Sequence, residues 1–266
     1  MDIKGNMPTL EEFTLALRAY QQVQAEIGIS PPAGGQILPN AMMNILERSG
    51  PLPAHSVVFG IAGDGLPLLL RLDRPATGPI LVVADKGSGK TAFLQTLAQS
   101  ARHLNPVEET AILALTDFPD EWQLDNMPAR ALRVYPAYED AATDLLLRLT
   151  DWVTTNQRQR SIILLFDGLD SILHLGNPAQ EAFAFLLQHG PASRLWPVVS
   201  VNAARALKLP DWLAFFQTRI YGRIANPQTS DDLTHLSGAP LDSLFPGAEF
   251  CIRHQSRWMR FWLPSF

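Results

Sequence analysis

Short apolar runs alternate with amphipathic stretches along the chain from residue 56 onward. Residues 79–84 form a continuous apolar run, which is typical of a strand buried on both faces of a sheet. Residues 92–104 follow with apolar side chains at helical spacing, so they predict an amphipathic helix. Strands and helices that alternate in this way predict an α/β fold, in which helices cover both faces of a mainly parallel sheet.

The same pattern predicts the other elements of this fold. Further strands are expected at residues 111–116, 131–135, 162–166, 197–202 and 219–224. Helices are expected between them at residues 138–153, 179–189 and 203–216. Two β-hairpins are expected as additions to the sheet. The first joins residues 56–61 to 68–72 through a Gly-Asp-Gly turn, and the second joins residues 249–254 to 257–263.

Residues 1–52 differ from the rest and predict a helical N-terminal arm and linker ahead of a domain spanning residues 53–266. Thr9 and Glu12 have the spacing of a capping box, in which two side chains satisfy backbone amides at the start of a helix. A second short helix is expected at residues 40–48, between stretches rich in glycine and proline. The alternative is an N-terminal extension packed on the main domain.

The sequence from Ala84 to Thr91, ADKGSGKT, fits the phosphate-binding loop G-x-x-x-x-G-K-[ST] with alanine in the first position. In such a loop, backbone N–H groups and the N-terminus of the following helix bind phosphate oxygens. Lys90 would reach the β- and γ-phosphates, and the Thr91 hydroxyl would ligate Mg²⁺. The residues expected to bind the nucleotide are Asp85, Lys86, Gly87, Ser88, Gly89, Lys90 and Thr91. The alternative is a coincidental turn between a strand and a helix.

A phosphate loop needs an acidic residue that holds the metal at the end of a neighbouring strand. Asp167 follows the apolar strand 162–166 and has this Walker B form. P-loop ATPases of the additional-strand type usually carry a glutamate at the next position, which polarises the attacking water, but here that position is Gly168. Asp170 either substitutes for this base or caps the helix that follows. We therefore expect nucleotide binding, with slow or degenerate hydrolysis.

Three further residues are assigned to the site as hypotheses. The strand 197–202 is expected beside the phosphate-loop strand, where Asn202 either faces the γ-phosphate or caps the next helix. Arg219 and Arg223 alternate with apolar residues on the late strand, as expected where a strand end meets solvent or a partner. Either arginine is a hypothetical arginine finger, a cation that stabilises the transition state in a neighbouring subunit. The alternative is an ion pair within its own subunit.

These residues resemble the FtsK/HerA group of P-loop ATPases, and especially the FtsK-like domains of type VII secretion ATPases (EssC-like). The phosphate loop carries most of the resemblance. Residues 59–70 are similar to the entry hairpin of these domains, residues 217–220 to their late "TRI" segment, and residues 241–250 to their closing element. The resemblance covers residues 55–266 and implies a RecA-like sheet, ATP and Mg²⁺. It also implies a homo-oligomeric ring or related ATPase subunits, and a polymer substrate, DNA or polypeptide.

Gly168 departs from active FtsK motors and resembles the degenerate ATPase domains found beside active ones in secretion motors. The expected function is therefore an ATP-binding domain, slow or degenerate in hydrolysis, in a translocation or secretion-type assembly. The alternative is a nucleotide-gated signalling switch, because Asp167-Gly-Leu-Asp170 also resembles the Walker B motif of STAND-like NTPases. Those proteins carry a helical bundle and repeats after the core, whereas the residues after Ile224 are β-rich here. A third possibility is a nucleotide-dependent scaffold without turnover.

Composition narrows the class of protein further. Hydrophobic residues make up 47% of the 266 residues and charged residues 18%, which excludes an intrinsically disordered chain. The apolar runs are far shorter than the roughly 20 residues of a membrane helix. One cysteine and no visible signal peptide indicate a cytoplasmic protein. Because the net charge is −5, we do not expect tight stand-alone DNA binding.

Overall fold

The structure is a computed structural model that describes residues 42–124, 127, 131–156, 160–254 and 257–264. Six parallel strands form its central part. Strand β7 lies between β3 and β6, so the expected insertion of a strand beside the phosphate-loop strand is confirmed. All three are buried over nearly their whole length, which explains their continuous apolar sequences. The six strands are β3 (Ile80–Ala84), β4 (Thr110–Thr116), β5 (Leu132–Pro136), β6 (Ser161–Asp167), β7 (Leu195–Asn202) and β8 (Thr218–Tyr221).

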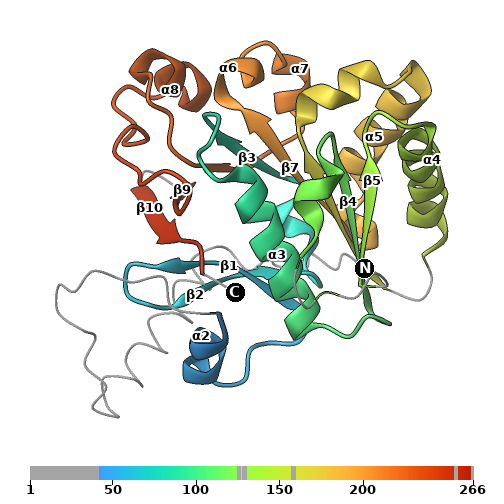
Figure 1. Cartoon of the computed structure of the whole chain (residues 1–266), viewed down its shortest axis with the longest axis horizontal. Coiled ribbons are helices and arrows are strands. Elements are labelled where there is room, and N and C mark those ends of the chain that lie inside the picture. The colour runs from blue at the N-terminus through green and yellow to red at the C-terminus, as the bar shows by residue number, and fades with distance from the viewer. Residues whose placement is uncertain (1–41, 125–126, 128–130, 157–159, 255–256, 265–266) are drawn as a thin grey trace, which may run out of the picture. The chain divides into compact units, whose positions relative to one another are not determined.

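Two antiparallel hairpins extend this sheet, as expected. One consists of β1 (Ser56–Ala62) and β2 (Pro67–Arg71), and the other of β9 (Glu249–His254) and β10 (Arg257–Trp262). Strand β9 pairs with β8, and β10 pairs with β1. Within the described residues, ten strands therefore form one sheet in the order β2-β1-β10-β9-β8-β3-β7-β6-β4-β5 (Figure 1). The mainly parallel sheet with hairpin additions is confirmed.

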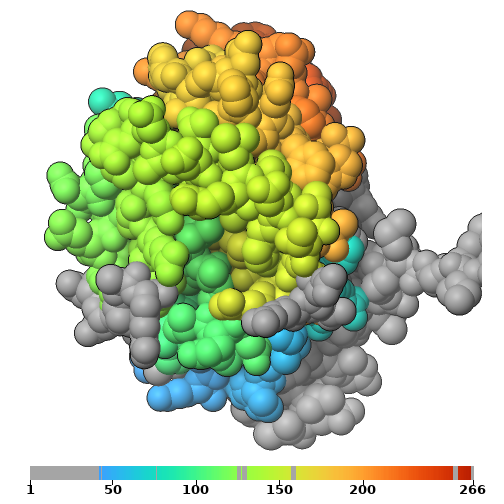
Figure 2. Space-filling view, turned by 90° about the vertical axis from the view of Figure 1, so that its right-hand side faces the viewer, coloured from blue at the N-terminus to red at the C-terminus, as the bar shows by residue number. Residues whose placement is uncertain are grey.

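Helices cover both faces of the sheet. Helix α3 (Lys90–Leu104) packs on one face, with the side chains of Ile80 and Val82 of β3. Helices α4 (Asp140–Thr155) and α5 (Asn177–His189) pack on the other, with Leu81 and Val83 of the same strand. Figure 2 shows the side of the molecule where the part of the chain from α4 to α5 forms most of the surface.

The remaining helices differ in how well the sequence predicts them. The single helix expected at 203–216 is wrong, because α6 (Ala203–Ala206) and α7 (Pro210–Leu213) are separate helices. Pro210 lacks the N–H that a helix interior needs, and it therefore starts a new helix. Helix α8 (Pro227–Thr234) was not predicted, although its cap is a recognisable signal: the Asn226 side chain accepts a hydrogen bond from the Thr229 amide. Helix α2 (Met42–Ser49) confirms the second short helix, whereas Thr9 and Glu12 lie outside the described residues.

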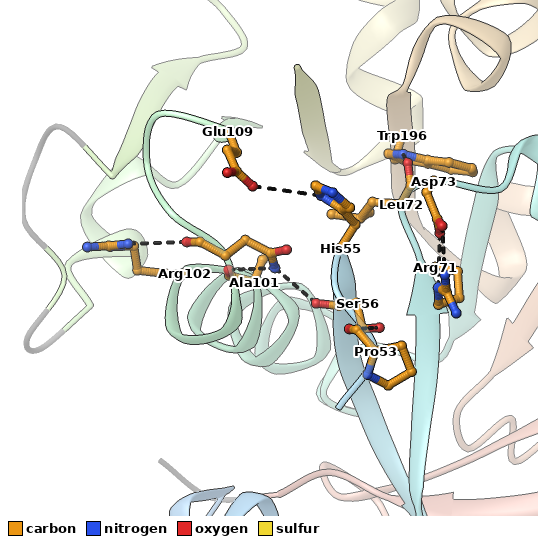
Figure 3. A network of polar contacts seen from close by, with 11 residues as sticks. Pro53, His55, Ser56, Arg71, Leu72, Asp73, Ala101, Arg102, Glu109 and Trp196 are labelled. Atoms are coloured by element: carbon orange, nitrogen blue, oxygen red, sulfur yellow. Dashed lines mark hydrogen bonds and ion pairs between the residues drawn. The ribbon is translucent and has the colours of Figure 1, made fainter. Parts of the chain in front are cut away.

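A network of hydrogen bonds fastens the first hairpin to the core (Figure 3). The buried Asn105 side chain, at the C-terminus of α3, donates to the carbonyl oxygens of Ser56 and Ala101 at 2.9 and 3.0 Å. The Trp196 indole of β7 donates to the carbonyl oxygen of Leu72, just after β2. Side chains from the core thus satisfy backbone groups of both strands at the open end of the hairpin. Among the described residues, every helix is too short or too polar to cross a lipid bilayer.

The single cysteine, Cys251, allows the buried position of β9 to be tested. Cys251 is fully buried, and burial raises the pKa of its thiol to about 12. Because the thiolate is the reactive form, we expect no reaction of the folded protein with a disulfide reagent such as DTNB at pH 8. Addition of denaturant should release one equivalent of reactive thiol, measured by absorbance. Rapid stoichiometric labelling without denaturant would contradict this placement of β9.

Candidate nucleotide-binding site

The phosphate loop connects the carboxyl end of β3 to the N-terminus of α3, as the motif requires. Gly87 and Gly89 have φ angles of 76° and 83°, which glycine adopts more readily than other residues. Gly89 is needed for a second reason: a Cβ atom added there would lie 2.7 Å from the carbonyl oxygen of Gly247. The closing segment of the domain therefore packs directly on the loop.

Lys90 is held inside the loop by its own backbone. Its Nζ atom donates to the carbonyl oxygens of Ala84 and Asp85, at 3.1 and 2.8 Å. Burial lowers the pKa of the Lys90 ammonium group, and the carboxylates of Asp167 and Asp85 oppose this shift. An anionic phosphate oxygen is a stronger acceptor than these carbonyl groups, so the ammonium group is placed to bind one.

The two residues expected to hold the metal are in contact. The Thr91 hydroxyl donates to the Asp167 carboxylate at 2.7 Å, across 76 positions of sequence. Hydroxyl and carboxylate oxygens are ligands that suit Mg²⁺, which is bound by one or two carboxylates together with substrate phosphates. The described residues contain no cluster of three His, Cys, Asp or Glu side chains able to hold a metal by themselves. The donor set therefore fits a magnesium ion delivered with a nucleotide.

Ser200 is a site residue that sequence reasoning missed. Its hydroxyl donates to the other Asp167 oxygen at 2.6 Å, so the carboxylate is oriented by two hydroxyl groups. Ser200 lies opposite Asp167 in the pairing of β7 with β6. The available signal was one polar residue within the apolar strand Leu195–Asn202.

The carboxylate proposed as a base lies in an ion pair. Asp170 lies inside the first turn of η3 (Leu169–His174) and does not cap it; its carboxylate pairs with the guanidinium group of Arg205. Gly168, at the usual position of the base, has a φ of 114°. A further carboxylate, Asp117, follows β4 and accepts a hydrogen bond from the Ser171 hydroxyl. Sequence reasoning missed Asp117, although it directly follows an apolar strand.

The three residues assigned to the site as hypotheses, Asn202, Arg219 and Arg223, lie at different positions relative to the phosphate loop. Asn202 lies opposite Ala84 at the start of the loop, and its side chain accepts the Ala204 amide, so it caps α6. Arg223 lies just beyond β8, where its carbonyl oxygen accepts the Asp85 amide of the loop. Its guanidinium group donates to the carbonyl oxygen of Asp242. Arg223 therefore lies at the loop.

Arg219 does not lie at the loop. It pairs with Leu81, three residues before the end of β3, and its guanidinium group donates to the carbonyl oxygens of Leu213 and Phe216. Among the other loop residues, Lys86 is exposed, Ser88 is buried, and Asp85 accepts the Ala225 amide through its carboxylate.

Comparison with known proteins gives relatives by structure alone, since no family model and no curated protein matches the chain. EccC of Thermomonospora curvata, ATPases 2 and 3 in complex with a signal sequence peptide, matches 88% of this chain with a TM-score of 0.64 and 13% identity. EssC of Geobacillus thermodenitrificans, ATPases 2 and 3, matches 87% with a TM-score of 0.65 and 10% identity. The chain spans 45% and 48% of these two structures, about half of each.

A third solved structure covers more of its own length. The conjugation coupling protein TcpA of pCW3 was solved as a monomer with ATPγS. The match covers 94% of this chain and 82% of the TcpA chain, with a TM-score of 0.63 and 15% identity. At such low identities the likeness defines the fold. The expected RecA-like architecture is confirmed, and the chain shares the fold of the EssC, EccC and TcpA structures.

Proposed function

We propose that the chain is an FtsK-like ATPase domain that binds MgATP, hydrolyses it slowly, and acts in a cytoplasmic translocation or secretion-type assembly. The observation that carries the proposal is the convergence of Lys90, Thr91 and Asp167 at one end of β3. These side chains supply a phosphate-binding cation and two magnesium ligands. The ATPγS bound to TcpA, which shares the fold, supports ATP as the nucleotide.

Titration calorimetry with MgATPγS tests the proposal directly. We expect saturable binding in the micromolar range, lost when EDTA removes the metal, because Thr91 and Asp167 contact the nucleotide through magnesium. Binding that is equally tight in EDTA would contradict the proposed metal role. Failure to bind at millimolar nucleotide would refute the proposed function.

Slow hydrolysis is expected for the isolated domain. Gly168 provides no carboxylate at the usual position, and Asp170 is engaged by Arg205. We expect steady-state turnover below about 1 s⁻¹, at the low end of typical enzyme values. Phosphate release measured with saturating MgATP tests this expectation, with Asp167→Asn as the control for contaminating ATPases. A faster rate that Asp167→Asn abolishes would show that the site contains an effective base.

The assembly is proposed from the relatives. EccC was solved with a signal sequence peptide, and TcpA is a conjugation coupling protein. We therefore propose a polymer substrate, polypeptide or DNA, for this domain. We also propose that it works as a homo-oligomeric ring or docked on related ATPase domains, with Arg223 facing a neighbouring nucleotide.

A further inference from the structure

Asp167, the expected metal ligand outside the phosphate loop, lies on one side of that loop, and so does Ser200, which orients its carboxylate. Asp167 and Ser200 belong to β6 and β7, which follow β3 in the sheet on the side opposite β8. A magnesium ion held by Asp167 and Thr91 would bind the terminal phosphates of a nucleotide, which would place the γ-phosphate end toward Asp167. The nucleoside is attached at the other end of the phosphate chain. It would therefore leave the loop toward β8.

The segment that precedes β9 lies on this nucleoside side. Tyr221 of β8 pairs with Cys251 of β9 in antiparallel orientation, so the residues just before β9 lie at the carboxyl end of β8. They contact the loop itself, because a Cβ atom on Gly89 would lie 2.7–2.9 Å from three backbone atoms of Gly247. Figure 1 shows α8, β9 and β10 on one side of the molecule and α4 and β5 on the other.

Phe245 is an exposed aromatic residue in this segment. The residue is 60% exposed, and its ring contacts that of Trp262 with centroids 6.0 Å apart. Its backbone is fixed on both sides: its amide donates to the Glu249 carboxylate at 2.9 Å, and its carbonyl oxygen accepts the Glu249 amide. The buried Glu249 carboxylate also pairs with Arg260 at 3.5 Å. A large exposed ring thus lies two residues before Gly247, the residue that contacts the phosphate loop.

We propose that Phe245 is the stacking platform for the base of the nucleotide bound at the phosphate loop, an inference that rests on the proposed function. A purine base offers a flat face that an aromatic ring can cover, and Trp262 packs against the Phe245 ring in a tilted arrangement. Stacking does not read the edge of the base, so the platform accepts adenine and guanine alike. Phe245 thereby gives affinity for a nucleoside without selecting which one.

The test compares a nucleotide with a ligand that has no base. Affinities for MgATPγS and magnesium tripolyphosphate are measured by calorimetry for the wild type, Phe245→Ala and Phe245→Tyr. Tyr138→Ala is the matched control, because Tyr138 is 66% exposed and follows β5, at the far edge of the parallel strands. We expect Phe245→Ala to weaken MgATPγS binding about 5- to 150-fold, the range measured for base–aromatic stacking. Tripolyphosphate binding should be unchanged, and Phe245→Tyr and Tyr138→Ala should bind as the wild type does.

Three results would overturn the inference while leaving the proposed function intact. One is equal MgATPγS affinity of Phe245→Ala and the wild type. Another is an equal loss for MgATPγS and tripolyphosphate, which would show a disturbed loop. The third is a wild type that binds tripolyphosphate as tightly as MgATPγS. A wild type that binds neither ligand would instead refute the proposed function.

Discussion

Replacing Lys90 with alanine is expected to lower the affinity for MgATP by about one to two orders of magnitude, or about 1.5–3 kcal/mol. The change removes the cation that the loop carbonyls of Ala84 and Asp85 hold in place for a phosphate oxygen. A charge-assisted hydrogen bond to phosphate is among the stronger polar contacts, and the half-buried position of Lys90 strengthens it further.

Arg148→Ala is the matched control for this experiment. Arg148 lies on the exposed face of α4, so its removal changes the net charge of the protein equally without touching the loop. Calorimetric titration of the three proteins gives the comparison, and thermal unfolding checks that each is folded. Equal affinities of Lys90→Ala and Arg148→Ala would rule out the assigned role of Lys90.

Arg223→Ala is expected to lower turnover by at least about 100-fold without weakening nucleotide binding, because an arginine finger contributes about 10³–10⁵ in rate. Arg219→Ala is the internal comparison. Arg219 pairs with Leu81, three residues before the loop end of β3, and its guanidinium group donates to two carbonyl groups, whereas that of Arg223 donates to one. Loss of Arg219 should therefore lower stability instead of turnover. Single-turnover hydrolysis of radiolabelled ATP is sensitive enough for a slow enzyme.

A finger acts across a subunit interface, and mixing experiments test that requirement. Lys90→Ala subunits keep Arg223 but lack a working site, whereas Arg223→Ala subunits keep the site but lack the finger. A mixture of the two should regain turnover that neither shows alone. Light scattering with ATPγS should show a mass above the 29.4 kDa monomer. A monomeric mass with and without nucleotide, or a mixture that stays inactive, would exclude the finger.

The parts of the site that the sequence predicted are those built by local pattern. The loop, its strand and its helix are contiguous, so motif and apolar spacing specify them together. Asp167 follows one apolar run, and its contact with Thr91 follows from the strand order of a parallel sheet. These positions follow from the period of each element and from the rule that the carboxyl ends of parallel strands meet at one edge of the sheet.

The parts that the sequence did not predict depend on register or on distant contacts. Arg219 and Arg223 differ in sequence by four positions, and only the pairing of Arg219 with Leu81 shows which of them reaches the loop. The ion pair of Asp170 with Arg205 spans 35 positions, and no local pattern signals it. The contact of Gly89 with Gly247 spans most of the domain. By contrast, Pro210 is a local signal of a helix break within residues 203–216, where apolar periodicity alone predicts a single helix.

The two end strands of the sheet restrict how copies of this chain can join. Within the described residues these are β2 and β5, each five residues long. β2 begins with Pro67 and ends with the charged Arg71, while β5 carries the exposed Arg133 and ends with Pro136. Short edges with proline and charge are poor templates for an added strand, so the sheet resists polymerising edge to edge. Copies of this chain are therefore expected to contact one another through surfaces other than these two edges.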